Sequence, residues 1–360
     1  MDVRQAKATA KEWVEVNRGE WSGFRAAHLV GGITAMADEA PFPAGKDVDL
    51  HLILAEGSPA LTPTTPVAGV IEAPFAGLPI EAGFKSEAAY ASPEAVLSNP
   101  EIAYHLTVES VLVDDAGWLA GLQAAVRRDY RRCRWVRARI EHERAGLAGA
   151  LAMRSFAGAA WGAPGEVNVL GYTTMFMAAA LAVATLGPPR LGNRMLVHME
   201  DLLAGLGQAD LHEEVLAVLG VRDADRATAE RLLSEGAEAF DLAVQIERRP
   251  GPFIPFEHKL HGHLRPYFVD ACRAMIAEGH HREALAWTSP FFLASTEVVL
   301  VDGPEELRPF FAARRDGLLH DLGFDHPEAV AAGFERANRV AERVFALAEG
   351  IVAGHPDVLD

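Results

Sequence analysis

The sequence predicts an α+β protein in which a small domain, built on a mixed β-sheet with flanking helices, precedes a larger all-helical region. Short apolar segments separated by glycine and proline fill the N-terminal part of the 360-residue chain, a pattern typical of strands. Beyond about residue 125 we find only helical periodicity and helix-capping signals. We therefore expect one domain over residues 1–125 and a second over 126–360. A turn near 248–255 is a candidate break between two helical subdomains.

The small domain is expected to begin with an amphipathic helix and to continue with strands. In the first 20 residues charged side chains alternate with Trp13, Val14 and Val16, unlike a targeting signal with its basic and apolar parts. Helices then start at Ser92-Pro93-Glu94 and at Asn99-Pro100-Glu101, because each triplet supplies a capping side chain, a first-turn proline and an acid. The predicted strands are 27–30, 48–55, 69–73 and 78–84.

The rest of the chain is expected to be helical. A helix that follows Asp114-Asp115-Ala116-Gly117 should run through Val126. Turn clusters such as Gly187-Pro188-Pro189 and Gly303-Pro304 separate later helices. The predicted helical segments are 127–156, 168–186, 192–206, 210–219, 224–247, 258–278, 282–297, 304–322 and 327–353.

Composition narrows the functional classes. The formal charge of −17 and the pI near 5.3 argue against a nucleic-acid partner, because neutralising phosphates requires a basic surface. The longest apolar stretch, 175–186, is too short to cross a bilayer, so no membrane association is expected. The two cysteines, Cys133 and Cys272, belong to no metal-binding or disulfide pattern. We expect a cytoplasmic protein.

Two carboxylates, Asp47 and Asp49, mark a candidate metal site at the start of a predicted strand. Side chains alternate along a strand, so both should project from one face while Val48 points into the core. A third acid, Glu81, lies on a later strand that could pair beside the first. Three carboxylates form a hard oxygen site of the kind that holds Mg²⁺ against triphosphate oxygens.

A glycine turn precedes these carboxylates. Gly31 and Gly32 follow an apolar segment, and glycine at such a turn lets backbone N–H groups approach a phosphate closely. Lys46, next to the first aspartate, is a further candidate for phosphate contact.

With these residues in place, the chain resembles the nucleotidyltransferase superfamily, and within it the kanamycin (aminoglycoside) nucleotidyltransferase-like group. The superfamily pattern is a small glycine turn, a spacer, Asp-x-Asp or Asp-x-Glu in an apolar strand, and a third acid between apolar residues. Gly31-Gly32, Asp47-Val48-Asp49 and Ile80-Glu81-Ala82 occupy those places. The stretches 77–87 and 111–119 look like the aminoglycoside group specifically. The likeness covers about residues 25–125, and the helical continuation is similar mainly in kind.

The resemblance implies a Mg²⁺-dependent nucleotidyltransferase that moves a nucleoside monophosphate from an NTP, expected to be ATP, to a hydroxyl of a small, aminoglycoside-like acceptor, with release of pyrophosphate. Asp47 and Asp49 would hold the metal, and Glu81 would complete its shell. Gly32 stands where a serine is common, so Thr34 would have to supply the missing hydroxyl contact. Related aminoglycoside enzymes form dimers, and we expect a homodimer.

Two of these assignments leave an alternative open. Glu72, on the predicted strand 69–73, is an alternative to Glu81 as the third carboxylate. The aminoglycoside group takes its general base from the first helix after the small domain. This implies Glu141, with Glu143 as the alternative on the same helix. The spacing equally fits a salt bridge from Glu141 to an arginine three or four residues away.

Other patterns are open to more than one interpretation. Eight arginines between residues 127 and 144 could contact phosphates or form a solvated or domain-bridging face. Five histidines near expected helix ends lack a convincing companion acid or cysteine, so we do not expect zinc there: His258, His261, His263, His280 and His281.

Three further functions remain compatible with the residues. The chain could be a non-catalytic nucleotide-binding or regulatory protein on the same fold, which the altered glycine turn permits. It could instead adenylylate a protein hydroxyl. A helical interaction protein, with the small domain as a scaffold, is the third.

Overall fold

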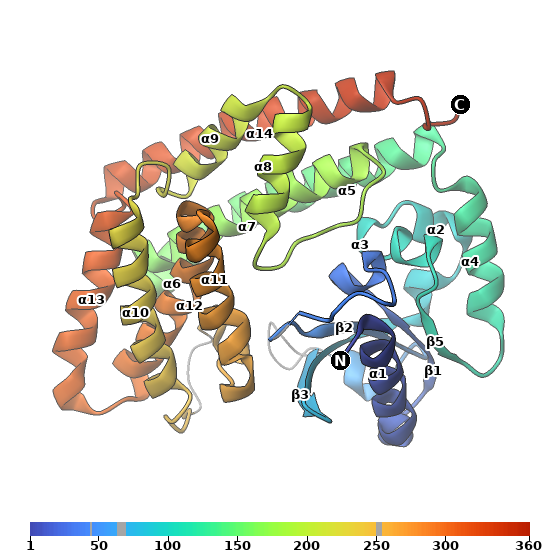
Figure 1. The fold of residues 1–360 in the computed structure, drawn as a ribbon, viewed down its shortest axis with the longest axis horizontal. Coiled ribbons are helices and arrows are strands. Elements are labelled where there is room, and N and C mark those ends of the chain that lie inside the picture. Colours follow the sequence, from blue (N-terminus) through green and yellow to red (C-terminus); the bar gives the residue numbers. More distant parts are fainter. Residues whose placement is uncertain (44, 63–69, 250–253) are drawn as a thin grey trace. The chain divides into compact units, whose positions relative to one another are not determined.

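The structure is a computed structural model that describes residues 1–43, 45–62, 70–249 and 254–360 (Figure 1). Its contacts divide the chain into two compact units. The sheet unit comprises Met1–Arg144, Ala179–Gly192 and Leu347–Asp360, and the helical unit comprises Ala145–Ala178 and Asn193–Ala346. The sheet unit therefore contains residues 1–125, the next residues through Arg144, and two segments from later in the sequence.

The protein has an α+β fold, and its sheet is mixed, as predicted. The described part of the sheet unit forms five strands in the order β3-β4-β2-β1-β5. β2 and β4 are parallel, and the other neighbouring strands are antiparallel. The strands are β1 Phe24–Leu29, β2 Val48–Leu54, β3 Val70–Phe75, β4 Leu78–Ser86 and β5 Val111–Asp114.

The sequence predicts four of these strands to within a few residues and misses β5. The predicted strand 69–73 begins at residue 69, which lies outside the described residues. β5 has only four residues, too few for a period-2 pattern to stand out. It is nevertheless an integral strand, since it pairs antiparallel with β1.

Side chains of β2 alternate between two apolar cores. Val48, Leu50 and Leu52 pack in one core with helix α1, Val3–Asn17, which lies against the sheet in Figure 1. Ile53 belongs to the second core, formed with short helices that precede and follow β5. The strand period thus assigns Val48 to the interior, and it assigns the intervening positions of β2 to the opposite face.

The short helices of the second core begin where their capping residues predict. Ser92 Oγ accepts a hydrogen bond from Ala95 N (3.2 Å), and Asn99 Oδ1 accepts one from Glu101 N (3.0 Å). These two helices are α2 Pro93–Leu97 and α3 Pro100–Ala103, and the third helix of this core, α4 Trp118–Asp129, starts after Gly117, which has no capping side chain.

Long helices dominate the remainder of the chain. Three of them, α5, α7 and α14, have residues in both units. The helices are α5 Cys133–Ala152, α6 Arg154–Trp161, α7 Ala163–Ala184, α8 Met195–Gly205, α9 Ala209–Val218, α10 Arg226–Ala243, α11 Ala271–Glu278, α12 His281–Asp302, α13 Arg308–Asp321 and α14 Pro327–Gly354.

Two predicted helices are interrupted or irregular in the structure, and several others begin or end up to five residues from the observed bounds, as at α7 and α12. The segment 127–156 is interrupted, because α4 ends at Asp129 and the chain turns before α5. In the segment 258–278 an α-helix forms only from Ala271 onward. Short 3₁₀ turns and a π-helical turn that starts at Pro266 occupy the residues before Ala271. The candidate break near 248–255 lies partly outside the described residues, at 250–253.

The end of the chain is part of the sheet unit. Leu359 N donates to Arg131 O (2.9 Å), and Leu359 O accepts from Cys133 N (2.7 Å). The segment that closes the chain therefore pairs with the turn between α4 and α5.

Two helices, Ala163–Ala184 and His281–Asp302, are long and apolar enough to cross a membrane by length and composition alone. In each, 67% of the most apolar window is buried inside the structure. Core helices of globular proteins pass the same test, so this observation weighs little toward a membrane location.

The described arginines of the 127–144 cluster mostly have protein partners. Arg139 is fully buried; it donates to Leu97 O (2.8 Å) and Tyr130 O (2.9 Å), and its guanidinium lies 4.1 Å from the centre of the Tyr130 ring. Arg128 and Arg132 both bond Asp129. Arg139 thus joins the ends of α2 and α4 to α5.

Candidate metal and nucleotide site

The sheet brings the three predicted carboxylates together. β2 and β4 are parallel neighbours, and their register pairs Asp49 with Glu81. Asp47 lies directly before β2, two positions from Asp49, so the same strand period points both side chains to one face. One carboxylate oxygen from each of the three residues lies within 4.8 Å of the others. Asp47 is 5% exposed, while Asp49 and Glu81 are half-buried.

Glu72, the alternative third carboxylate, takes a different place. It lies on β3, opposite Glu81 in the antiparallel register of β3 and β4. The group of closely spaced ligand atoms in the described chain includes Glu81 and does not include Glu72.

The glycine turn packs directly on Asp49. Val30 N donates to Asp49 O (2.9 Å), and a short 3₁₀ helix, Gly31–Ala35, follows at once. Gly31 has a φ of +64°, in the left-handed region. A Cβ at this position would overlap Asp49 Oδ2 and lie 2.8 Å from Asp49 Cγ. Only glycine therefore fits both the turn and the carboxylate beside it.

Lys46 and Thr34 both lie next to the glycine turn. A Cβ added to Gly32 would lie 3.2 Å from Lys46 Nζ, which places the ammonium group next to the turn. Thr34 is buried, and its hydroxyl donates to Gly31 O (2.8 Å). The Thr34 hydroxyl thus fixes the turn in this structure, and Lys46 supplies the positive charge close to it.

The two candidate bases on α5 differ sharply in environment. Glu141 is exposed and accepts a hydrogen bond from Arg144 Nε (3.0 Å), the salt bridge that its spacing also permits. Glu143 is buried, and this burial, together with the charge of Glu101, raises its pKa to about 8. At neutral pH Glu143 is therefore protonated. Neither residue belongs to the group formed by Asp47, Asp49 and Glu81.

Three buried histidines that no sequence motif marks lie near these residues: two are on the sheet, and His105 begins a short 3₁₀ turn, His105–Thr107. His28 on β1 pairs in register with His51 on β2, two residues beyond Asp49. His28 Nε2 lies 2.8 Å and His51 Nδ1 lies 3.0 Å from the Tyr90 hydroxyl. His105 Nδ1 lies 3.0 Å from Thr34 Oγ1, the hydroxyl that holds the glycine turn. The only sequence signal for this cluster is that His28 and His51 stand inside apolar strands.

Burial keeps these histidines neutral. It lowers the pKa of His28 to about 4 and that of His105 to about 3, and it lowers the pKa of His51 well below its usual value. A neutral imidazole can both donate and accept, which suits a network that ends on hydroxyl groups.

We expect acid to destabilise the protein between about pH 6.5 and pH 4. The unfolded chain protonates these histidines near pH 6.5, whereas the folded chain keeps His28 neutral down to about pH 4. The stabilisation is complete above pH 6.5, and on the order of 2 kcal/mol is lost by about pH 4.5 for each of His28 and His105. Urea denaturation at about pH 7.5, 5.5 and 4.5 measures this loss. A His105→Asn variant, which has one buried histidine fewer, should lose less unfolding free energy over this pH range. Equal unfolding free energies of the unmodified protein at all three pH values would contradict the prediction.

Comparisons with models of protein families, with curated proteins and with solved structures find no match to this chain.

Proposed function

We propose that the protein is a nucleotidyltransferase that moves a nucleoside monophosphate from an NTP, with ATP as the first candidate, to a hydroxyl of a small acceptor and releases pyrophosphate. One observation carries the proposal. Three carboxylates from adjacent parallel strands converge next to a left-handed glycine turn that has a lysine beside it. Carboxylates bind divalent cations, and backbone amides at such a turn bind phosphate oxygens, so the two parts suit the two halves of a metal-bound triphosphate.

The residues of the site fit Mg²⁺, because all three side chains offer hard oxygen ligands within a small volume. Asp47, Asp49 and Glu81 would hold the ion, which supplies charge neutralisation on the triphosphate and on the leaving pyrophosphate. Gly31 and Gly32 would present backbone N–H groups to the phosphates. Lys46 would add a point charge on the same side of the turn.

For the acceptor we propose a cationic polyol of the aminoglycoside kind. The net charge of −17 favours the approach of a cationic small molecule. Glu141 is our proposed general base, and Glu143, whose pKa burial raises to about 8 so that it is mostly protonated at neutral pH, is the alternative. We further propose a cytoplasmic homodimer. The two cysteines are free, as suits a reducing compartment, and light scattering tests the dimer.

The first experiment measures pyrophosphate release with Mg²⁺, each NTP in turn, and a panel of aminoglycosides and other polyols. The Asp47→Asn/Asp49→Asn double variant serves as the inactive control. We expect release that depends on one NTP and one class of acceptor and that disappears in the double variant. Thermal stabilisation by nucleotide without pyrophosphate release from any acceptor, including proteins of a cell extract, would instead identify a non-catalytic nucleotide-binding protein.

A further inference from the structure

A second group of ligand-type side chains lies in the helical unit, on three different helices. Glu200 belongs to α8, His212 to α9 and Glu283 to the first turn of α12. One ligand atom from each residue lies within 4.8 Å of the other two. His212 lies 12 positions after Glu200, and Glu283 lies 71 positions after His212, so no local sequence motif predicts the group.

Two of the three side chains are almost completely removed from solvent. His212 is 2% exposed and Glu283 is 3% exposed. His212 Nε2 lies 3.1 Å from Glu283 Oε1, and the other ring nitrogen, Nδ1, is buried with no hydrogen-bond partner among the described residues. The imidazole of His212 is thus in direct hydrogen-bond contact with the Glu283 carboxyl group. Glu283 is therefore a buried acidic group that contacts a buried imidazole.

The neighbouring arginines do not pair with this group. Arg282 donates to both carboxylate oxygens of Glu213 (2.8 and 3.0 Å), and Arg222 bonds Asp223. Arg282 is close enough to interact electrostatically with Glu200 and Glu283, but its hydrogen bonds go elsewhere. Two carboxylates and one imidazole consequently share a small, largely buried space without a bonded guanidinium.

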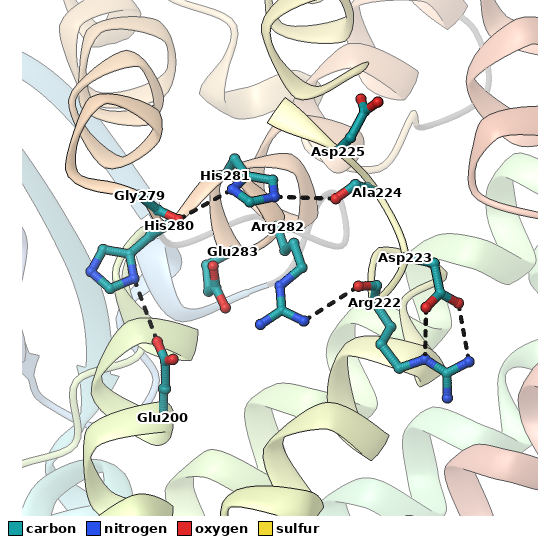
Figure 2. Close-up of a pocket in the computed structure, with 10 residues that line it drawn as sticks. All are labelled: Glu200, Arg222, Asp223, Ala224, Asp225, Gly279, His280, His281, Arg282 and Glu283. Atoms are coloured by element: carbon teal, nitrogen blue, oxygen red, sulfur yellow. Dashed lines mark hydrogen bonds and ion pairs between the residues drawn. The ribbon is translucent and has the colours of Figure 1, made fainter. Parts of the chain in front are cut away.

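A cavity of about 470 Å³ opens beside the group. Glu200, Glu283 and His280 all line it, and His280 Nδ1 lies 3.4 Å from Glu200 Oε2 (Figure 2). Glu283 also lines an apolar slot on whose wall Trp287 and Tyr172 lie. The two glutamates of the group thus line the cavity, whereas His212 is not among its lining residues.

We propose that Glu200, His212 and Glu283 bind a divalent transition-metal ion of the Zn²⁺ class. One imidazole and two carboxylates are a donor set that zinc accepts, and a doubly charged ion would balance the two carboxylates. Zinc bound by three protein ligands keeps a further position open, which here would face the cavity. The imidazole sets this site apart from the all-carboxylate group of the sheet unit. This inference does not depend on the proposed nucleotidyltransferase function.

The test measures Zn²⁺ binding by calorimetry and by equilibrium dialysis with metal analysis, against a competing chelator that suppresses weak surface binding. It uses the full-length Asp47→Asn/Asp49→Asn variant, so that the sheet unit contributes no site. We expect one Zn²⁺ per chain and a metal-dependent rise in Tm. Glu200→Gln in this background should weaken Zn²⁺ binding by about 100-fold, and because Glu200 is half-buried the variant should fold.

Glu214→Gln is the matched control, because Glu214 lies on α9 beside the group but bonds Arg343 instead. Its Zn²⁺ affinity should equal that of the background protein. Absence of stoichiometric Zn²⁺ binding overturns the proposal. So does an affinity that Glu200→Gln leaves unchanged, or one that Glu214→Gln lowers equally. Since Co²⁺ reports its ligands spectroscopically, loss of a Co²⁺ absorption band in a folded His212→Gln variant would add direct evidence for the imidazole.

Discussion

Replacing Asp49 by asparagine is expected to lower nucleotidyl transfer by about three orders of magnitude while leaving the fold intact. The amide has the shape of the carboxylate, and Asp49 is half-buried rather than part of the apolar core. What changes is the charge, and several kcal/mol of transition-state stabilisation by a bound divalent ion depend on it. Steady-state pyrophosphate release at saturating Mg²⁺, for the acceptor that the panel identifies, measures the effect.

The same substitution should also affect thermal stability, in the opposite direction to its effect on activity, when no metal is bound. Three carboxylates within 4.8 Å repel one another, so neutralising one should leave Tm unchanged or raise it when Mg²⁺ is removed by a chelator. The stabilisation that Mg²⁺ gives to the unmodified protein should be lost in the variant. Asp115→Asn is the matched control, since Asp115 is exposed and bonds Arg18 in the same unit. Near-normal turnover of Asp49→Asn would refute the proposed function.

Separate variants distinguish the two candidates for the third carboxylate. Glu81→Gln should lose activity to an extent comparable with Asp49→Asn, whereas Glu72→Gln should keep most of it. The reverse result would assign the third ligand to Glu72.

Replacing Gly31 by alanine is the second substitution with a large expected effect. The new Cβ would require a φ of +64° and would overlap the Asp49 carboxylate, so either the turn or the carboxylate must move. We expect about a hundredfold loss of transfer, because displacement of a ligand by about 1 Å costs this much in other sites. A destabilisation of about 1–2 kcal/mol should accompany it, from the strained backbone conformation. Activity assays measure the loss of transfer, and urea denaturation measures the loss of unfolding free energy.

Gly57→Ala separates backbone strain from displacement of Asp49. Gly57 has a φ of +83°, but no atom lies within 4 Å of the position of its Cβ. This variant should lose about the same stability as Gly31→Ala and keep its activity. If both variants lost activity equally, the close packing of Gly31 on Asp49 would have no functional meaning.

Much of the sheet and of the carboxylate group follows from local pattern. Asp47 and Asp49 flank a core residue in an apolar run, and the period of a strand alone places them on one face. That Glu81 joins them depends on strand pairing, and local pattern alone leaves the third carboxylate open between Glu81 and Glu72. The observed parallel register of β2 and β4 is what aligns Glu81 with Asp49.

The remaining features depend on contacts between residues far apart in sequence. The buried cluster of His28, His51 and His105 needs three segments to meet, and no spacing rule predicts such meetings. Likewise, Glu200 and Glu283 come together only through helix packing. Helix breaks are difficult to predict from the sequence for another reason. The turn before α5 contains no glycine or proline, so the helical pattern of the sequence continues through it.

The pairing of Leu359 with the turn before α5 has a consequence for how the chain is made. Residues of the helical unit end at Ala346, so a ribosome has released all of them before it delivers the segment that completes the sheet unit. Of the two units, the sheet unit therefore receives its last segment after the helical unit has been made. A fragment that stops at residue 125 lacks the segments 126–144, 179–192 and 347–360 of its own compact unit, and would leave apolar surface of the second core, which Tyr130, Trp135 and Leu186 contact, exposed to water.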